Sequence, residues 1–261
     1  SINSNGHQTL KFYLPKFCGI KKREIMEKFS QLLTKVENLT SLTLAANMAR
    51  IHDAEIIKCL HQMSQLQELS IAATLNESPS EFIGLFKNLV NLRRLDLNLK
   101  VDEDYESAQL QEFFSEMENL SNLISFSITA NDIIVDPAIQ HMAKLESLQE
   151  IRIISWCYEN NDILSKISNA VPSLKNLLTL YIDLNSEIGS TLDTGLLALF
   201  KSLKGNYKVK ECYVRDASCV GTDKLIKEIG QSISTMRNLK VFHLMFNDYE
   251  HSISDKGVNY R

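Results

Sequence analysis

The sequence contains little glycine and even less proline. Its 261 residues include nine Gly and four Pro, whereas the phosphate-binding loops of nucleotide-dependent enzymes place several glycines close together. Neither G-x-x-x-x-G-K-[ST] nor G-x-G-x-x-G occurs. The five cysteines are odd in number and scattered, and none forms a C-x-x-C pair. This pattern favours neither a disulfide framework nor a zinc site. We therefore expect no cofactor, no metal, and a reducing, cytoplasmic compartment.

Long apolar runs and an excess of one charge are also lacking. No stretch approaches the roughly 18 apolar residues of a membrane span, and the N-terminus lacks the basic-then-apolar pattern of a secretory signal. The 28 basic and 32 acidic residues give a net charge of -4, which provides no general attraction to nucleic acid or anionic lipid. We expect neither a membrane nor a nucleic acid as partner.

Recognisable catalytic motifs are missing as well. The six histidines include no H-E-x-x-H, and no serine lies in G-x-S-x-G. A Cys–His pair assembled by the fold stays open, because catalytic groups can meet from distant parts of a chain. However, Cys59 and Cys212 occupy positions expected in the core, where an inert, buried thiol is the default. The sequence predicts a protein that is not an enzyme.

A short apolar pattern recurs along the chain. Leu39, Leu42 and Leu44 begin a segment of the form L-x-x-L-x-L-x-x-N that ends at Asn47. Seven further copies follow at intervals of 25 to 32 residues, and all 24 positions in the three defining columns are apolar. These copies begin at Leu66, Leu92, Leu123, Leu148, Leu177, Val209 and Leu239. Residues 38–247 therefore contain eight repeats.

Two columns of the pattern are rich in asparagine. The residue before the first apolar position is Asn in five of the eight repeats. The last motif position is Asn in four of them, and there we expect the side chain to bond the backbone of the turn that leaves the strand. These four are Asn47, Asn131, Asn185 and Asn247.

Each repeat is predicted to form one strand and one helix. Alternation such as Leu42-Thr43-Leu44 places apolar residues on one face of a short strand. The second half of each repeat has apolar residues at helical spacing. Asp136, followed by Pro137, and Asp223 are candidate helix N-caps. We expect parallel strands centred near residues 43, 70, 96, 127, 152, 181, 213 and 243.

The chain resembles the leucine-rich repeat family in its long-repeat, ribonuclease-inhibitor-like form. This resemblance implies an α/β solenoid, a horseshoe with a parallel β-sheet on the concave face and α-helices on the convex face. Residues 1–37 are interpreted as a divergent N-terminal repeat, and residues 248–261 as the start of a further repeat or a truncated end. Because solenoids need caps on their exposed core ends, we expect the chain to be part of a longer chain or complex.

The strand residues between the leucines identify the candidate binding surface. They carry three basic and five acidic side chains, which argues against a phosphate-backbone ligand. In the C-terminal half they include Tyr, Arg and His, types that anchor protein interfaces. The alternative is a solvated sheet face with cross-strand ion pairs, such as Asp96 with a neighbouring Arg. The predicted partner-binding residues are Arg94, Asp96, Glu150, Arg152, Tyr181, Asp183, Tyr213, Arg215 and His243.

Three other features have simple structural explanations. The basic cluster at residues 21–23 is typical of a solvated patch or a linker, and the acidic residues 102–106 are typical of an exposed loop. The spacing of a calcium-binding loop is absent, so the acidic residues do not indicate a calcium site. Trp156 stands where the motif Asn is missing, and either contacts a partner at the rim or fills the space that the Asn leaves.

These observations predict a non-catalytic protein–protein interaction scaffold, as a subunit or segment of a larger intracellular assembly. The alternative is a regulatory protein that acts on an enzyme, since similar long-repeat solenoids include small-GTPase activators and substrate-recognition arms of ubiquitin ligases. The convex, helical side is the competing binding surface. The sequence does not identify the partner.

Overall fold

The computed structural model shows an α/β protein in which strands and helices alternate along the chain. It describes residues 8–14, 28–29, 31–33, 35–36, 38–46, 59–75, 84–101, 107–157, 163–186, 193–216 and 222–246. The chain divides into two compact units, unit 1 (residues 1–128) and unit 2 (residues 129–261). The boundary falls within one strand, β5 (Ser125–Asn131).

Unit 1 contains four strands side by side in chain order, followed by the beginning of β5. The strands are β1 (Gln8–Leu14), β2 (Leu39–Ala46), β3 (Glu68–Leu75) and β4 (Arg94–Val101). Each neighbouring pair among these four is parallel. The backbone N–H of Ser125 donates to the carbonyl of Arg93, so β5 begins beside the start of β4.

The core of unit 1 is rich in phenylalanine. Phe86 contacts Phe113 of α3 (Ser107–Ser115) at a ring-centroid distance of 5.1 Å, and Phe113 contacts Phe114 at 4.9 Å. A 3-10 helix, η2 (Glu116–Asn119), follows and buries Met117. Near the N-terminus, Phe12 of β1 stacks on Phe29 at 3.8 Å. Aromatic contacts between successive segments therefore join the repeats of this unit.

Unit 2 continues the same alternation. Its strands β6 (Glu150–Cys157), β7 (Thr179–Ser186), β8 (Glu211–Asp216) and β9 (Val241–Phe246) pair in parallel and in chain order. Its helices are α4 (Asp132–Met142), α5 (Ile163–Ala170), α6 (Asp193–Leu203) and α7 (Asp223–Ile233), with the 3-10 helix η3 (Val171–Ser173) after α5.

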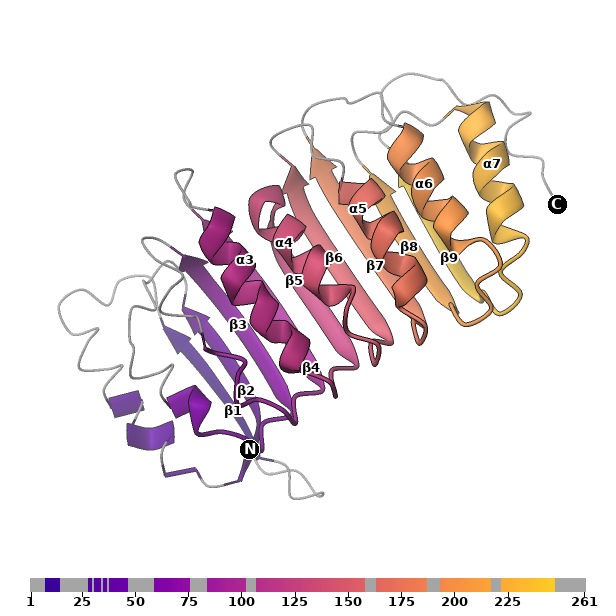
Figure 1. Cartoon of the computed structure of the whole chain (residues 1–261). Helices are drawn as coiled ribbons and strands as arrows, with labels where there is room; N and C mark the ends of the chain where they lie inside the picture. Colours follow the sequence, from indigo (N-terminus) through magenta and orange to yellow (C-terminus); the bar gives the residue numbers. More distant parts are fainter. Residues whose placement is uncertain are drawn as a thin grey trace. The chain divides into compact units, whose positions relative to one another are not determined.

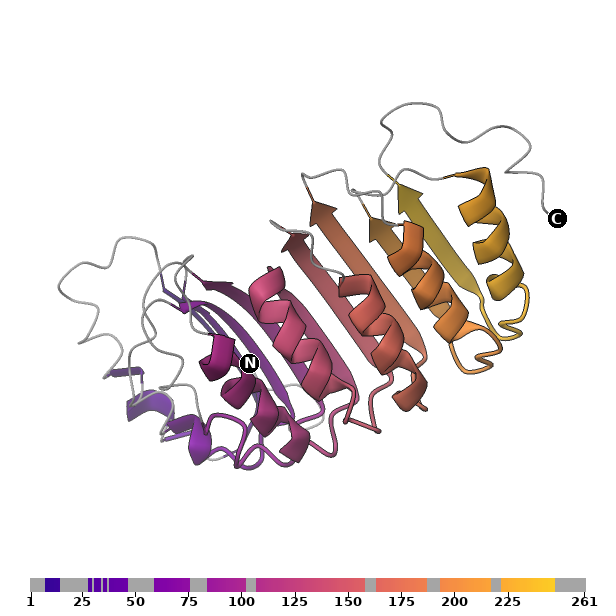
Figure 2. The same ribbon diagram turned by 45° about the horizontal axis from the view of Figure 1, so that its top comes forward.

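The helices of unit 2 cover one face of its strands (Figures 1 and 2). Lys166 of α5 pairs with Asp136 of α4 at 2.7 Å, and Lys201 of α6 lies 4.0 Å from Glu228 of α7. Among the described elements of this unit, none lies on the opposite face of the strands, which we call the sheet face. Side chains between the core positions of each strand are therefore available to solvent there.

The apolar columns of the repeats form the core. In the first seven repeats every residue of the three columns is at most 4% exposed. In the last repeat Leu239, Phe242 and Leu244 are half-buried. Each predicted strand centre falls within an observed strand, and the parallel pairing within each unit is confirmed.

The asparagines that bond across repeats belong to the other column, and the predicted bond from the strand-end Asn to its own turn stays a prediction, because the turns after Asn47, Asn185 and Asn247 lie outside the described residues. Asn185 is exposed, the buried Oδ1 of Asn131 has no hydrogen-bond partner among the described residues, and Asn47 and Asn247 lie outside them. The bonds across repeats come from the Asn that precedes the first apolar position. Its Nδ2 donates to a carbonyl in the matching turn of the preceding repeat: Asn91 to Ser64 at 2.8 Å, Asn122 to Val90 at 2.9 Å, Asn176 to Glu146 at 2.9 Å and Asn238 to Tyr207 at 2.5 Å. This column faces a carbonyl left free by a turn, whereas Asn185 at the strand end faces solvent.

Two predicted helix caps are wrong. α4 begins at Asp132, with Asn131 as its N-cap residue, so Pro137 lies inside the helix and Asp136 pairs with Lys166 instead of capping. In α7 the N-cap is Thr222, whose hydroxyl accepts from the N–H of Leu225 at 3.2 Å, and Asp223 is the first helical residue. In both helices the first helical residue comes earlier than the predicted cap implies.

Some predictions concern residues outside the described part. These are the basic cluster 21–23, the acidic residues 102–106 and the segment 248–261. Strand β1 lies within the predicted N-terminal repeat. Among the described residues, no helix combines the length and apolar character that crossing a membrane requires.

Candidate functional site

Three rows of side chains cross the sheet face of unit 2. Strands β6 to β9 are in register, so Arg152, Tyr181, Tyr213 and His243 face one another across four strands. We call these four the aromatic row. Because side chains alternate between the two faces of a strand, the residues two positions before and after form parallel rows on the same face.

Each side chain of the aromatic row contacts the next one across the strands. The Tyr181 and Tyr213 rings stack at 4.3 Å with only 2° between their planes. The Arg152 guanidinium carbon lies 4.0 Å from the centroid of the Tyr181 ring, within the range of a cation–π interaction. At the other end, the His243 ring lies 5.9 Å from that of Tyr213. Each side chain therefore restricts the rotamers of its neighbour.

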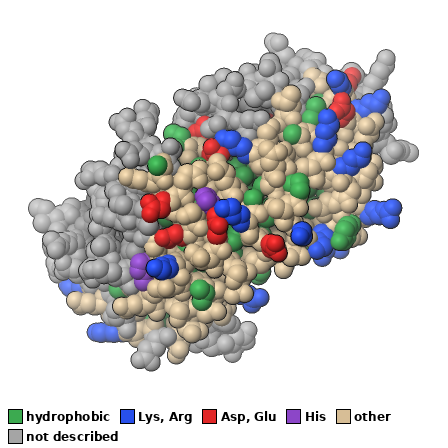
Figure 3. Space-filling model, viewed as in Figure 1, with side chains coloured by type: hydrophobic (Ala, Val, Ile, Leu, Met, Phe, Trp, Pro, Cys, Tyr) green, Lys and Arg blue, Asp and Glu red, His purple; other side chains and the backbone are tan. Residues whose placement is uncertain are grey.

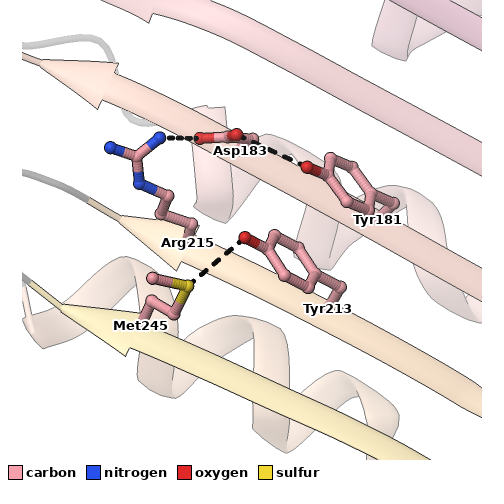
Figure 4. A network of polar contacts seen from close by, with 5 residues as sticks. All are labelled: Tyr181, Asp183, Tyr213, Arg215 and Met245. Carbon is pink, nitrogen blue, oxygen red and sulfur yellow. Dashed lines mark hydrogen bonds and ion pairs between the residues drawn. The ribbon is translucent and has the colours of Figure 1, made fainter.

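The second row, which we call the polar row, supports the tyrosines by hydrogen bonds. It contains Ile154, Asp183, Arg215 and Met245. Figure 4 shows the contacts: Tyr181 Oη donates to Asp183 Oδ2 at 3.5 Å, and Arg215 Nη1 donates to Asp183 Oδ1 at 3.3 Å. Tyr213 Oη donates to Met245 Sδ at 3.3 Å. Asp183 thus joins the two rows.

The electrostatics keep Tyr181 neutral. Burial raises the pKa of its phenol above the ordinary value, and the negative charge of Asp183 and the nearby Tyr213 hydroxyl raise it further, while Arg152 opposes them. A phenol in its neutral form can donate its proton to Asp183, as the geometry requires.

The third row carries glutamates at its first and third positions and an apolar residue at its last. It contains Glu150, Thr179, Glu211 and Val241, and both glutamates are exposed. Val241 is 41% exposed, and Met245 of the polar row is 48% exposed. Strand β9 therefore presents apolar surface at one side of the aromatic row.

The remaining predicted residues lie in unit 1. Arg94 Nε is 3.9 Å from Glu68 Oε1, with both side chains more than half exposed. Asp96 Oδ2 accepts from the Ser70 hydroxyl at 3.2 Å, not from an arginine. These residues line a shallow hollow of about 200 Å³ whose other side chains include Ser41, Thr43 and Ser127. None of the described residues that line this hollow is aromatic, so they offer less apolar contact than the aromatic row.

The helix-bearing face is the alternative surface. Lysine and arginine side chains gather over α6 and α7 of unit 2 in Figure 3. They include Lys201, Lys224 and Lys227, all exposed. Exposed lysines keep a surface soluble and give little binding energy by themselves.

The structure adds residues that sequence reasoning did not select. Met245, Val241 and Ile154 contribute apolar surface beside the aromatic row. Their positions between core residues place them on this face. The register puts Ile154 and Met245 in the polar row and Val241 in the third row, on either side of the aromatic row. Trp156 is half-buried and in register with Asn185, next to the polar row.

The described residues provide no site for metal chemistry. No three His, Cys, Asp or Glu side chains among them are grouped so that they could hold an ion. Burial raises the pKa of the Cys212 thiol to about 12, so this cysteine is not a nucleophile at neutral pH. No known protein-family model matches the chain.

Proposed function

We propose that the chain is a non-catalytic protein-binding module whose repeats stack as in a leucine-rich repeat solenoid. The recurrent parallel strands, the buried apolar columns and the asparagine bonds between successive turns support this interpretation of the repeats. The aromatic row is the observation that carries the functional proposal.

The aromatic row has the properties of an interface anchor. Tyrosine and arginine dominate the energetics of protein interfaces, because they combine apolar area with hydrogen-bonding groups. Tyr181 and Tyr213 already have restricted rotamers in their stack, so docking costs little additional side-chain entropy. The neighbouring Met245 and Val241 provide apolar surface that a partner can cover.

The partner is a protein in this proposal, and neither nucleic acid nor a membrane. The sheet face of unit 2 carries Glu150, Asp183 and Glu211 against Arg152 and Arg215, and this balance is unfavourable for a polyanion. We place the protein in a reducing intracellular compartment, as a subunit or segment of a larger assembly. Cys59 and Cys212 are buried, and neither forms a disulfide within the described part of the chain. Regulation of an enzyme by the same surface is the special case in which the partner is that enzyme or its substrate.

Replacement of both tyrosines by alanine tests the proposal. In Tyr181→Ala/Tyr213→Ala we expect partner binding to weaken by about 2 kcal/mol or more, which is the scale of interface hot spots. Binding is measured with partners captured from native lysate by the wild-type chain and identified by mass spectrometry. Circular dichroism should show an intact fold, because both side chains point away from the core.

Charge reversal on the helix-bearing face is the matched control. Lys224→Glu/Lys227→Glu changes exposed residues of α7 and should leave capture of the same partners unchanged. If the lysine variant abolishes capture and the tyrosine variant does not, the partner binds the helices and the proposal is wrong.

A further inference from the structure

The three arginines of the described sheet-face positions differ in what their charges contact. Arg94 lies beside Glu68 at 3.9 Å, and Arg215 beside Asp183 at 3.3 Å. Arg152 is exposed and has no carboxylate or hydrogen-bond acceptor within bonding distance among the described residues. It contacts the face of Tyr181 instead. A guanidinium on an aromatic face keeps its N–H donors, which lie in its own plane, available to another group.

The contact with Tyr181 restricts the position of Arg152 before a partner binds. Its guanidinium carbon lies 4.0 Å from the Tyr181 centroid, and Tyr181 is held by the stack on Tyr213 and by its bond to Asp183. A planar donor group that is already oriented loses less entropy when it binds a planar acceptor such as a carboxylate. The usual geometry is two parallel N–H···O bonds.

The charges around Arg152 limit the anion that it can bind. Arg215 and Asp183 neutralise each other. Glu150 is two residues before Arg152 on the same strand face, and Glu211 lies two strands away in register with Thr179. One free positive charge therefore stands in a surface that is otherwise negative. A single carboxylate matches it, whereas a phosphate with nearly two charges meets additional repulsion from the glutamates.

Apolar surface lies at a defined distance from this cation. Val241 and Met245 are on β9, three strands from Arg152 on β6. With about 4.8 Å between neighbouring strands, the separation is about 14 Å. An extended segment that crosses the strands covers this distance in about four residues, and side chains four apart point to the same side.

We infer that the sheet face of unit 2 binds an extended segment of a partner protein that places one Asp or Glu side chain on Arg152 and an apolar side chain about four residues away against Val241 and Met245. This inference rests on the proposed function and names the chemistry of the partner. The guanidinium donates to the carboxylate through the N–H groups at its edge while its face stays on Tyr181.

Selection from a random peptide library tests the inference without the natural partner. The probes are phage-displayed 12-residue peptides selected on the full chain, with affinities of the enriched sequences measured by fluorescence on synthetic peptides. We expect enriched peptides with one acidic residue about four positions from an apolar one. Replacement of that acidic residue by Gln or Asn should weaken binding to the wild-type chain at least tenfold.

Variants of the chain test whether the preference for an acidic peptide residue depends on Arg152. On Arg152→Gln the acidic peptide and its amide counterpart should bind equally, whereas on Lys224→Gln, which removes the same charge from α7, the tenfold difference should persist. A peptide with phosphoserine at the acidic position should bind the wild-type chain more weakly than the acidic peptide. Tighter binding of the phosphoserine peptide would mean that the site recognises phosphate and would overturn the inference.

Failure of the inference and failure of the proposed function give different results. Peptides that lose binding in Tyr181→Ala/Tyr213→Ala but lack an acidic residue, or whose acidic preference survives Arg152→Gln, overturn the carboxylate inference alone. If no enriched peptide depends on the two tyrosines, both the inference and the proposed function are wrong.

Discussion

The asparagines before the first apolar positions stabilise the contacts between neighbouring turns. Four of them donate to a carbonyl of the preceding repeat. Where the repeat of β8 has Lys208 in this column, its Nζ donates to the Oδ1 of Asn176. The column therefore couples successive repeats through polar side chains at the surface, in addition to the apolar core.

Replacement of Asn176 should lower the stability of the fold, whereas replacement of Asn185 at the strand end should not. In Asn176→Ala we expect the free energy of unfolding to fall by about 1 kcal/mol, because the carbonyl of Glu146 loses its donor. Denaturant titration measures the change. Asn185→Ala is the control, since that side chain is exposed, and equal losses in the two variants would contradict this role of the column.

Cys212 should be unreactive in the folded protein. Burial raises the pKa of its thiol from 9.0 to about 12, so at pH 9 the thiol stays protonated in the folded state while half of an unfolded population is thiolate. Alkylation at pH 9, followed residue by residue with mass spectrometry, should modify Cys212 only at the rate of unfolding. Modification as fast as in denaturant would show that the thiol is accessible.

At the scale of single elements, α4 and α7 each begin earlier than the predicted capping residue implies. α7 begins at Asp223 because the Thr222 hydroxyl accepts from the N–H of Leu225. α4 begins five residues before Pro137, so this helix continues through a proline, which has no backbone N–H to donate. A proline or an acidic residue alone therefore does not identify the N-cap residue.

Loss of the α7 cap should weaken this helix. Thr222→Ala should lower the free energy of unfolding by about 1 kcal/mol, whereas Thr222→Ser retains a hydroxyl acceptor and should cost only a few tenths. Thermal unfolding of the two variants measures the difference. A serine variant as unstable as the alanine variant would argue that packing of the threonine methyl, and not the cap, is responsible.

At the scale of the whole molecule, burial is not uniform along the strands. Core residues of β7 are almost inaccessible, as with Leu180 and Ile182. In β9 no residue is fully buried, and among the described strands β9 pairs only with β8. Since local stability follows buried apolar contacts and backbone pairing, the last strand should open more readily than the interior ones.

Hydrogen exchange should reveal this gradient. We expect backbone amides of β9 to exchange at least about tenfold faster than those of β7 under native conditions. The measurement is deuterium uptake in peptides that cover residues 179–186 and 241–246. Equal protection in the monomeric chain would mean that β9 is covered by further structure.

The sequence alone determined the repeating unit and the composition of its core. Period-two alternation in the strands and helical spacing after them are local signals, and burial of their apolar side requires neighbouring repeats to stack. For this reason the strand centres and the buried columns of the first seven repeats agree with the prediction. The sheet-face residues followed from the same alternation.

The tertiary structure decided which of those residues contact one another. The stack of Tyr181 on Tyr213, the position of Arg152 over Tyr181 and the pairing of Arg215 with Asp183 depend on the register of residues about 30 positions apart. The repeat alignment places these residues in common columns, but it does not fix the rotamers that bring their side chains into contact. The role of Asn176 was also hidden, because a turn carbonyl in the preceding repeat becomes its acceptor only after the repeats have stacked.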